Sequence, residues 1–133
     1  MAQALAMQAL TARKIVAEVI SCGTFARADE EASQNAIAAM RDVYSLDISG
    51  HRARPACRED LEAASLVLTA TGGHKSHLMA LFPEFSAKIF TICEVSKGGT
   101  DISDPFGRDL QAYISCADQM KSYIDNICWE EML

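Results

Sequence analysis

The sequence has no Cys-x-x-C pair, no long apolar run and no basic patch, and each absence argues against a class of protein. Its five cysteines are an odd, scattered set, which argues against a disulfide framework or a zinc site. The apolar runs, such as residues 65–70, are too short to span a bilayer, and we expect no membrane partner. Lys and Arg number 12 against 18 Asp and Glu, so we expect no nucleic-acid partner. Residues 1–10 lack the features of a secretory signal, and we therefore expect a cytoplasmic protein.

Few side chains are spaced as metal or anion ligands. His74 and His77 lie three residues apart, but no third ligand accompanies them. We therefore expect no metal site and no cofactor. His51, Arg52 and Arg54 form a basic loop that could meet an anion, although three exposed basic side chains in a loop are common.

The length of 133 residues fits a single domain, residues 1–133, that can bury an apolar core without disulfides. Apolar periodicity, glycines and prolines divide the chain into alternating helices and strands. We expect helices at residues 1–13, 29–43, 58–64, 76–82 and 110–127, and strands at residues 15–20, 66–71 and 88–92. This alternation favours an α/β fold with a mainly parallel sheet, because parallel neighbours need crossover helices.

The segment 100–107, Thr-Asp-Ile-Ser-Asp-Pro-Phe-Gly, lies between the last predicted strand and the long final helix. It resembles the acid loop of low-molecular-weight protein phosphatases, and the resemblance extends to residues 1–5, 20–24, 49–54, 59–61 and 90–92. It implies that Asp104 is the general acid and that Pro105 and Phe106 belong to the substrate loop. Phe106 and the run Gly-His-Lys at 73–75 resemble the bacterial branch that includes protein-arginine phosphatases. Without this resemblance, Asp104-Pro105 would be an ordinary turn.

The nucleophile of that family lies in a Cys-x5-Arg loop that follows the first strand. Its thiolate attacks phosphorus while backbone amides and the arginine hold the phosphate oxygens. Six positions after the first four cysteines the sequence has Ala28, Ala63, Gly99 and Ser122, and Cys128 lies too near the end. We therefore expect a domain that lacks its first strand and nucleophile loop and is inactive as given.

The resemblance implies a flavodoxin-like three-layer sandwich with strand order 2-1-3-4, in which the absent first strand is an inner one. Its two neighbours would lose a hydrogen-bonding partner, so we expect the gap to close or the chain to form a homo-oligomer through exposed strand edges. Two functions stay open. One is a phosphatase that acts on phosphotyrosine or phosphoarginine in a protein substrate once the site is complete, and the other is a non-catalytic interaction or oligomerisation module.

Overall fold

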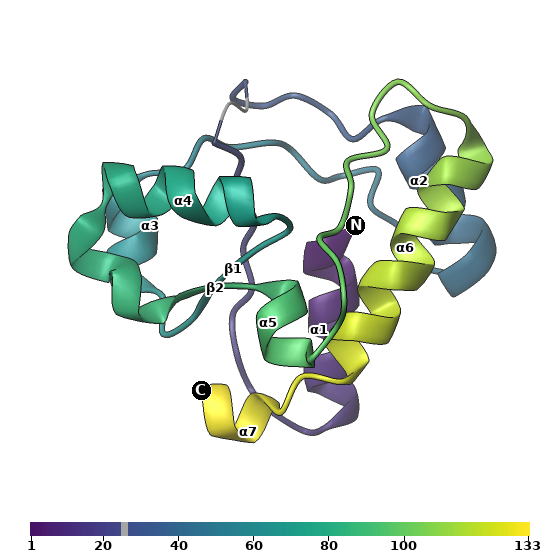
Figure 1. Cartoon of the computed structure of the whole chain (residues 1–133). Coiled ribbons are helices and arrows are strands. Elements are labelled where there is room, and N and C mark those ends of the chain that lie inside the picture. The colour runs from purple at the N-terminus through teal and green to yellow at the C-terminus, as the bar shows by residue number, and fades with distance from the viewer. Residues whose placement is uncertain (25–26) are drawn as a thin grey trace.

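Two short parallel strands lie at the centre of the fold, β1 (Val67–Thr69) and β2 (Ile89–Thr91) (Figure 1). The computed structural model describes residues 1–24 and 27–133. Val67 pairs with Ile89 and Thr69 with Thr91 in a parallel register. The strands predicted at residues 66–71 and 88–92 are therefore confirmed in place and orientation, although each is shorter than expected.

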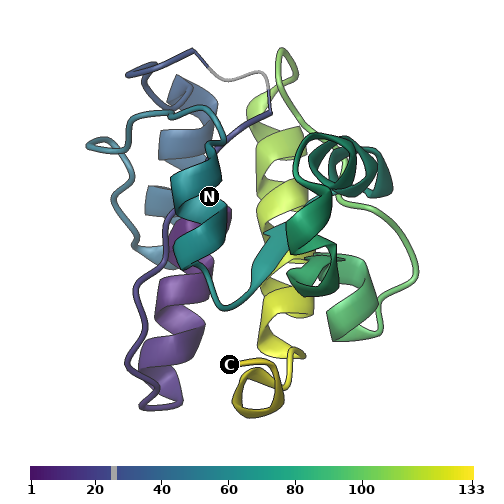
Figure 2. The same ribbon diagram turned by 90° about the vertical axis from the view of Figure 1, so that its left-hand side faces the viewer.

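Helices cover both faces of this sheet, with α3 and α4 on one side and α1, α2 and α6 on the other (Figures 1 and 2). Alternate residues of the first strand serve the two faces, since Leu66 and Leu68 pack on the larger core while Val67 packs on the smaller one. Burial on both sides explains why this strand is a continuous apolar run. The helices are α1 (Ala2–Ala12), α2 (Gln34–Tyr44), α3 (Arg58–Ala63), α4 (Gly72–Leu81), α5 (Ile92–Ser96), α6 (Leu110–Asp125) and α7 (Trp129–Met132), with a 3₁₀ helix at Pro83–Lys88.

The long helix α6 forms the floor of the larger core, as its apolar stripe predicts. Tyr113, Ala117 and Ile124 are buried on this stripe, and α6 packs against α1 and α2. Ala117 of α6 and Ala39 of α2 are both fully buried. Such small side chains allow two helix backbones to approach closely. Among the described residues, no helix is long and apolar enough to cross a membrane.

The strand predicted at residues 15–20 is wrong, because this segment belongs to no sheet. Its side chains still alternate as in a strand, with Ile15, Ala17 and Val19 packed on the core and Val16 fully exposed. Branched side chains favour an extended backbone, but a strand also needs a hydrogen-bonding partner. The described part of the chain supplies no such partner here.

Two helix starts differ from the prediction and one further helix was not predicted, and local caps explain all three cases. The second helix begins at Gln34 rather than at residue 29, because the Ser33 side chain caps it. Helix α4 begins at Gly72 rather than at residue 76, because Thr71 Oγ1 accepts the His74 N–H at 3.1 Å. Residues 92–96 form a helix that begins with a capping box between Thr91 and Glu94, and this box ends the strand at Thr91.

Candidate active site

The acid loop joins α5 to α6 and is attached to the sheet at its start. The Ile102 N–H donates to the Ala70 carbonyl at 2.9 Å, directly beyond the end of β1. The Gly72 N–H donates to Asp101 Oδ1 at 3.1 Å. Ile102 is almost fully buried, with 1% of its surface exposed. The loop therefore lies at the carboxyl end of the parallel strands, where open α/β sheets place their ligands.

Side chains of α6 hold the beginning and middle of the loop. The Tyr123 hydroxyl accepts the Thr100 N–H at 3.4 Å, and Gln119 Nε2 donates to Thr100 Oγ1 at 3.2 Å. The Cys116 thiol donates to the Ser103 carbonyl at 3.6 Å. The first half of the loop is therefore fixed to α6 as well as to the sheet.

The turn that carries Asp104 presents two side chains to solvent. Asp104 Oδ1 accepts the Phe106 N–H at 3.0 Å, and the Arg108 N–H donates to the Pro105 carbonyl at 2.9 Å. Pro105 is buried, whereas Asp104 is exposed and Phe106 exposes 76% of its surface. Asn35 Nδ2 of α2 donates to the Arg108 carbonyl at 3.1 Å and holds the far end of the turn. The local Asp-Pro turn is thus present, and it displays the carboxylate beside an aromatic ring.

The Cys116 thiol interacts electrostatically with both the start of α1 and this carboxylate. Burial lowers the pKa of the Met1 amine, and the Cys116 thiol nearby opposes this shift. Burial also raises the pKa of Cys116, with a further increase from Asp104 and a decrease from the Met1 ammonium. Burial lowers the pKa of His51, and the Met1 ammonium lowers it further. Cys116 is therefore the group that interacts with both Asp104 and Met1, and no side chain caps the first turn of α1.

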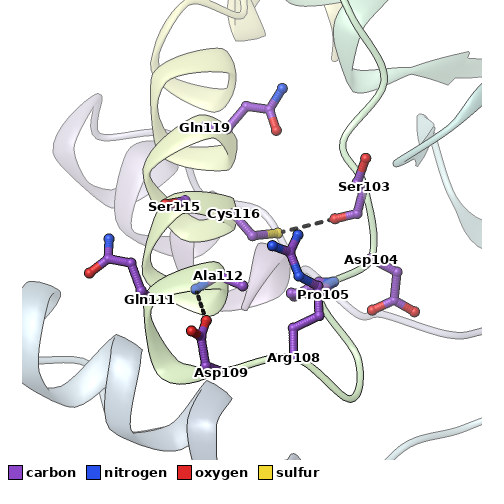
Figure 3. A pocket seen from close by; sticks show the side chains of 10 residues that line it. All are labelled: Ser103, Asp104, Pro105, Arg108, Asp109, Gln111, Ala112, Ser115, Cys116 and Gln119. Atoms are coloured by element: carbon purple, nitrogen blue, oxygen red, sulfur yellow. Dashed lines mark hydrogen bonds between the residues drawn. The ribbon is translucent and has the colours of Figure 1, made fainter.

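A hollow of about 350 Å³ lies between the acid loop and the outer face of α6 (Figure 3). Polar side chains line its helical wall, namely Gln111, Ser115 and Gln119. The Arg108 side chain reaches into it, while the Asp104 carboxylate points away from α6 (Figure 3). The hollow therefore adjoins the acid without enclosing its carboxylate.

None of the five cysteines supplies the nucleophile motif, since none has an arginine six positions on. The Cys116 thiol, which interacts electrostatically with Asp104, donates to the Ser103 carbonyl, and the Cys93 thiol donates to the Gly98 carbonyl at 3.2 Å. Within the described ranges, no three His, Cys, Asp or Glu side chains gather as a metal site. The structure thus contains a loop that holds a carboxylic acid, and the thiols of Cys116 and Cys93 each donate to a backbone carbonyl.

Comparison with known proteins settles which family has this loop. The family model for low molecular weight phosphotyrosine protein phosphatase matches residues 1–132. The chain belongs to this family. The protein-arginine-phosphatase of Geobacillus stearothermophilus is 34% identical over 111 residues, which are 83% of this chain and 74% of the relative. A probable low molecular weight protein-tyrosine-phosphatase of Ralstonia solanacearum is 30% identical over 125 residues, covering 94% of this chain and 81% of the relative.

The solved structures agree with this assignment. The low molecular weight protein tyrosine phosphatase of T. tengcongensis superposes with a TM-score of 0.91 at 35% identity, covering 99% of this chain and 88% of that chain. The phosphatase family predicted from the acid loop is therefore confirmed. The roles of Asp104, Pro105 and Phe106 stay predictions. Sequence reasoning missed the anchors Asn35 and Tyr123, because each lies far along the chain from the loop it holds.

Proposed function

We propose that these residues form the acid-bearing part of a low-molecular-weight protein phosphatase, and that Asp104 is its general acid. In this proposal the chain hydrolyses phosphoarginine or phosphotyrosine in proteins once a strand and a Cys-x5-Arg loop stand directly ahead of Met1. The observation that supports it is the exposed Asp104 carboxylate, held on a turn in the loop at the carboxyl end of the parallel strands, with the Cys116 thiol interacting with both Asp104 and Met1.

The chemistry assigns Asp104 a role in both steps. A thiolate attacks phosphorus, and Asp104 gives its proton to the departing phenol oxygen or guanidine nitrogen as the bond to phosphorus breaks. In the second step the Asp104 carboxylate accepts a proton from the water that hydrolyses the thiophosphate. A general acid contributes about 10²- to 10⁴-fold, and only when a nucleophile has engaged the substrate. The 133 residues by themselves should therefore give no turnover.

The experiment compares the chain with a version extended at Met1 by a strand that ends in Cys-x5-Arg. Phosphotyrosine and phosphoarginine are the substrates. The phenol of phosphotyrosine has a pKa of about 10 and leaves slowly without protonation, so its hydrolysis should depend on the general acid. We expect turnover only from the extended chain. Asp104→Asn should reduce that turnover by about 10²- to 10⁴-fold, and Cys→Ser in the added loop should abolish it. The ratio of the two substrates identifies the preferred one.

A second candidate, a non-catalytic interaction module, is favoured by one observation, the absence of a Cys-x5-Arg pair within the 133 residues. It requires that the extended chain folds but does not turn over either substrate. Turnover by the unextended chain that is lost in Asp104→Asn would contradict both candidates.

A further inference from the structure

The hollow between the acid loop and α6 is built from one stretch of chain, residues 103–119. Its volume of about 350 Å³ is at the small end of the roughly 300–1,000 Å³ of ligand pockets, so it fits a side chain better than a whole cofactor. Its helical wall presents Gln111 and Ser115, whose side chains are exposed and form no hydrogen bond with any described residue. The hollow therefore offers groups that are available to a polar ligand.

Arg108 is the cation that lines this hollow. Its side chain reaches in from the acid loop (Figure 3). Its backbone is fixed, because its N–H donates to the Pro105 carbonyl at 2.9 Å and its carbonyl accepts Asn35 Nδ2 at 3.1 Å. Several other arginines pair with a carboxylate, as Arg52 does with Glu31 at 3.4 Å. In the described part of the chain, no carboxylate pairs with the Arg108 guanidinium.

Two carboxylates border the hollow, and each is engaged with a backbone amide. Asp109 Oδ1 accepts the Ala112 N–H at 3.0 Å and caps α6. Asp104 Oδ1 accepts the Phe106 N–H at 3.0 Å, and its carboxylate points away from α6 (Figure 3). Neither carboxylate forms an ion pair with Arg108, whose guanidinium is therefore open to a carboxylate from another molecule.

We infer that Arg108 binds an aspartate or glutamate side chain that lies close to the phosphorylated residue of the protein substrate. A guanidinium presents parallel N–H donors that match the two oxygens of a carboxylate. A substrate whose phosphoryl group meets Asp104 lies over the acid turn. An extended chain advances about 3.3–3.6 Å per residue, so substrate residues within about three positions reach the hollow. This role rests on the proposed function, because Asp104 is what places the substrate over the turn.

Kinetics on the extended chain described above test this preference. Short peptides carry a phosphotyrosine among alanines, with glutamate, glutamine or lysine at one flanking position, and that position is moved along the peptide. At one or two positions glutamate should exceed glutamine in kcat/KM by about two- to fivefold, the range for an exposed ion pair. Arg108→Gln should make these two peptides equal, and Arg108→Glu should favour lysine instead. The readout is a ratio between peptides, so a general loss of activity cancels.

Arg41→Gln is the matched control, because it removes the same charge from an exposed site on α2 that does not line the hollow. It should leave the preference intact. The net charge of −6 disfavours glutamate at every position of the peptide, so the signature of Arg108 is a preference confined to particular positions. A flat profile, a preference that survives Arg108→Gln, or one that Arg41→Gln also removes would overturn the assignment.

Binding to the 133 residues without an extension separates this role from the proposed function. In a ¹⁵N-labelled chain, the Nε–H signal of Arg108 is identified by its loss in Arg108→Gln. It should shift more with the glutamate peptide than with the glutamine peptide, while the Arg41 signal responds equally to both. An extended chain without turnover, together with this shift, would refute the proposed function and keep the Arg108 site. Turnover without the preference would refute the Arg108 site alone, and absence of both turnover and the differential shift would refute both.

Discussion

Replacing Gly98 by alanine should destabilise the protein through the ring of Tyr123. A Cβ atom at Gly98 would lie 2.6 Å from Cζ of Tyr123, 2.8 Å from Cε1 and 2.9 Å from Cε2. Carbon atoms in contact prefer a separation of about 3.5–4.0 Å, so the ring must move by roughly an ångström. Overpacking costs about 1–3 kcal/mol in a core, and the lower end, about 1 kcal/mol, applies here because the clashing atoms are the far end of a half-buried side chain that can shift. Loss of the hydrogen bond from Thr100 to the moved hydroxyl would add about 0.5–1.5 kcal/mol.

Urea and thermal unfolding measure this effect, with a fall in Tm of roughly 3–10 °C expected for a domain of this size. Gly99→Ala is the matched control, because a Cβ there meets nothing within 4 Å and the change should be neutral or stabilising by about 0.4–1 kcal/mol. In a Tyr123→Ala background, Gly98→Ala should cost much less. Equal stability of the two alanine variants, or an undiminished cost of Gly98→Ala without the ring, would refute the reasoning.

Two further predictions concern a tyrosine and a helix cap. Burial, with the hydrogen bond that the Tyr44 hydroxyl donates to Asp118, raises the pKa of Tyr44 to about 12. The contribution of this hydrogen bond to stability should therefore be complete below pH 10 and lost as the pH rises through 12. Ultraviolet titration should show the Tyr44 phenol ionising at a lower pH in Asp118→Asn than in the unchanged protein. An unshifted titration would contradict the assignment. Thr91→Ala should cost about 0.5–2 kcal/mol in urea unfolding, because Thr91 Oγ1 accepts the Glu94 N–H at 3.0 Å. Thr91→Ser keeps the acceptor and should retain most of that stability, so an equal loss in both variants would count against the cap.

The parts of the fold that local sequence determines could be predicted. Helix α6 follows from apolar residues at three- and four-residue spacing, and the acid loop follows from Asp104-Pro105-Phe106-Gly107. The cap at Thr71 is also a local signal, since a threonine ahead of a helix accepts a backbone N–H three residues on. The early start of this helix is not predicted, because the two glycines that follow, Gly72 and Gly73, favour a turn.

The parts that depend on distant residues could not be predicted. Residues 15–20 have the composition of a strand, but whether they pair depends on a partner elsewhere in the chain. The anchors of the acid loop are equally remote, with Tyr123 lying 23 residues after Thr100 and Asn35 lying 73 residues before Arg108. Sequence periodicity reports which face of an element is buried. It does not report which distant side chain meets a loop.

Pro105 is buried, whereas Phe106 beside it is exposed. One residue therefore fixes the acid loop to the protein, and its neighbour is presented to solvent. The proline ring fills space inside the protein, whereas the aromatic ring beside it contributes almost no internal packing. Exchanges at position 106 should therefore alter unfolding free energy by no more than about 0.5 kcal/mol, as is usual at exposed sites. Evolution can thus vary the surface next to Asp104 without disturbing the scaffold that keeps the carboxylate in place.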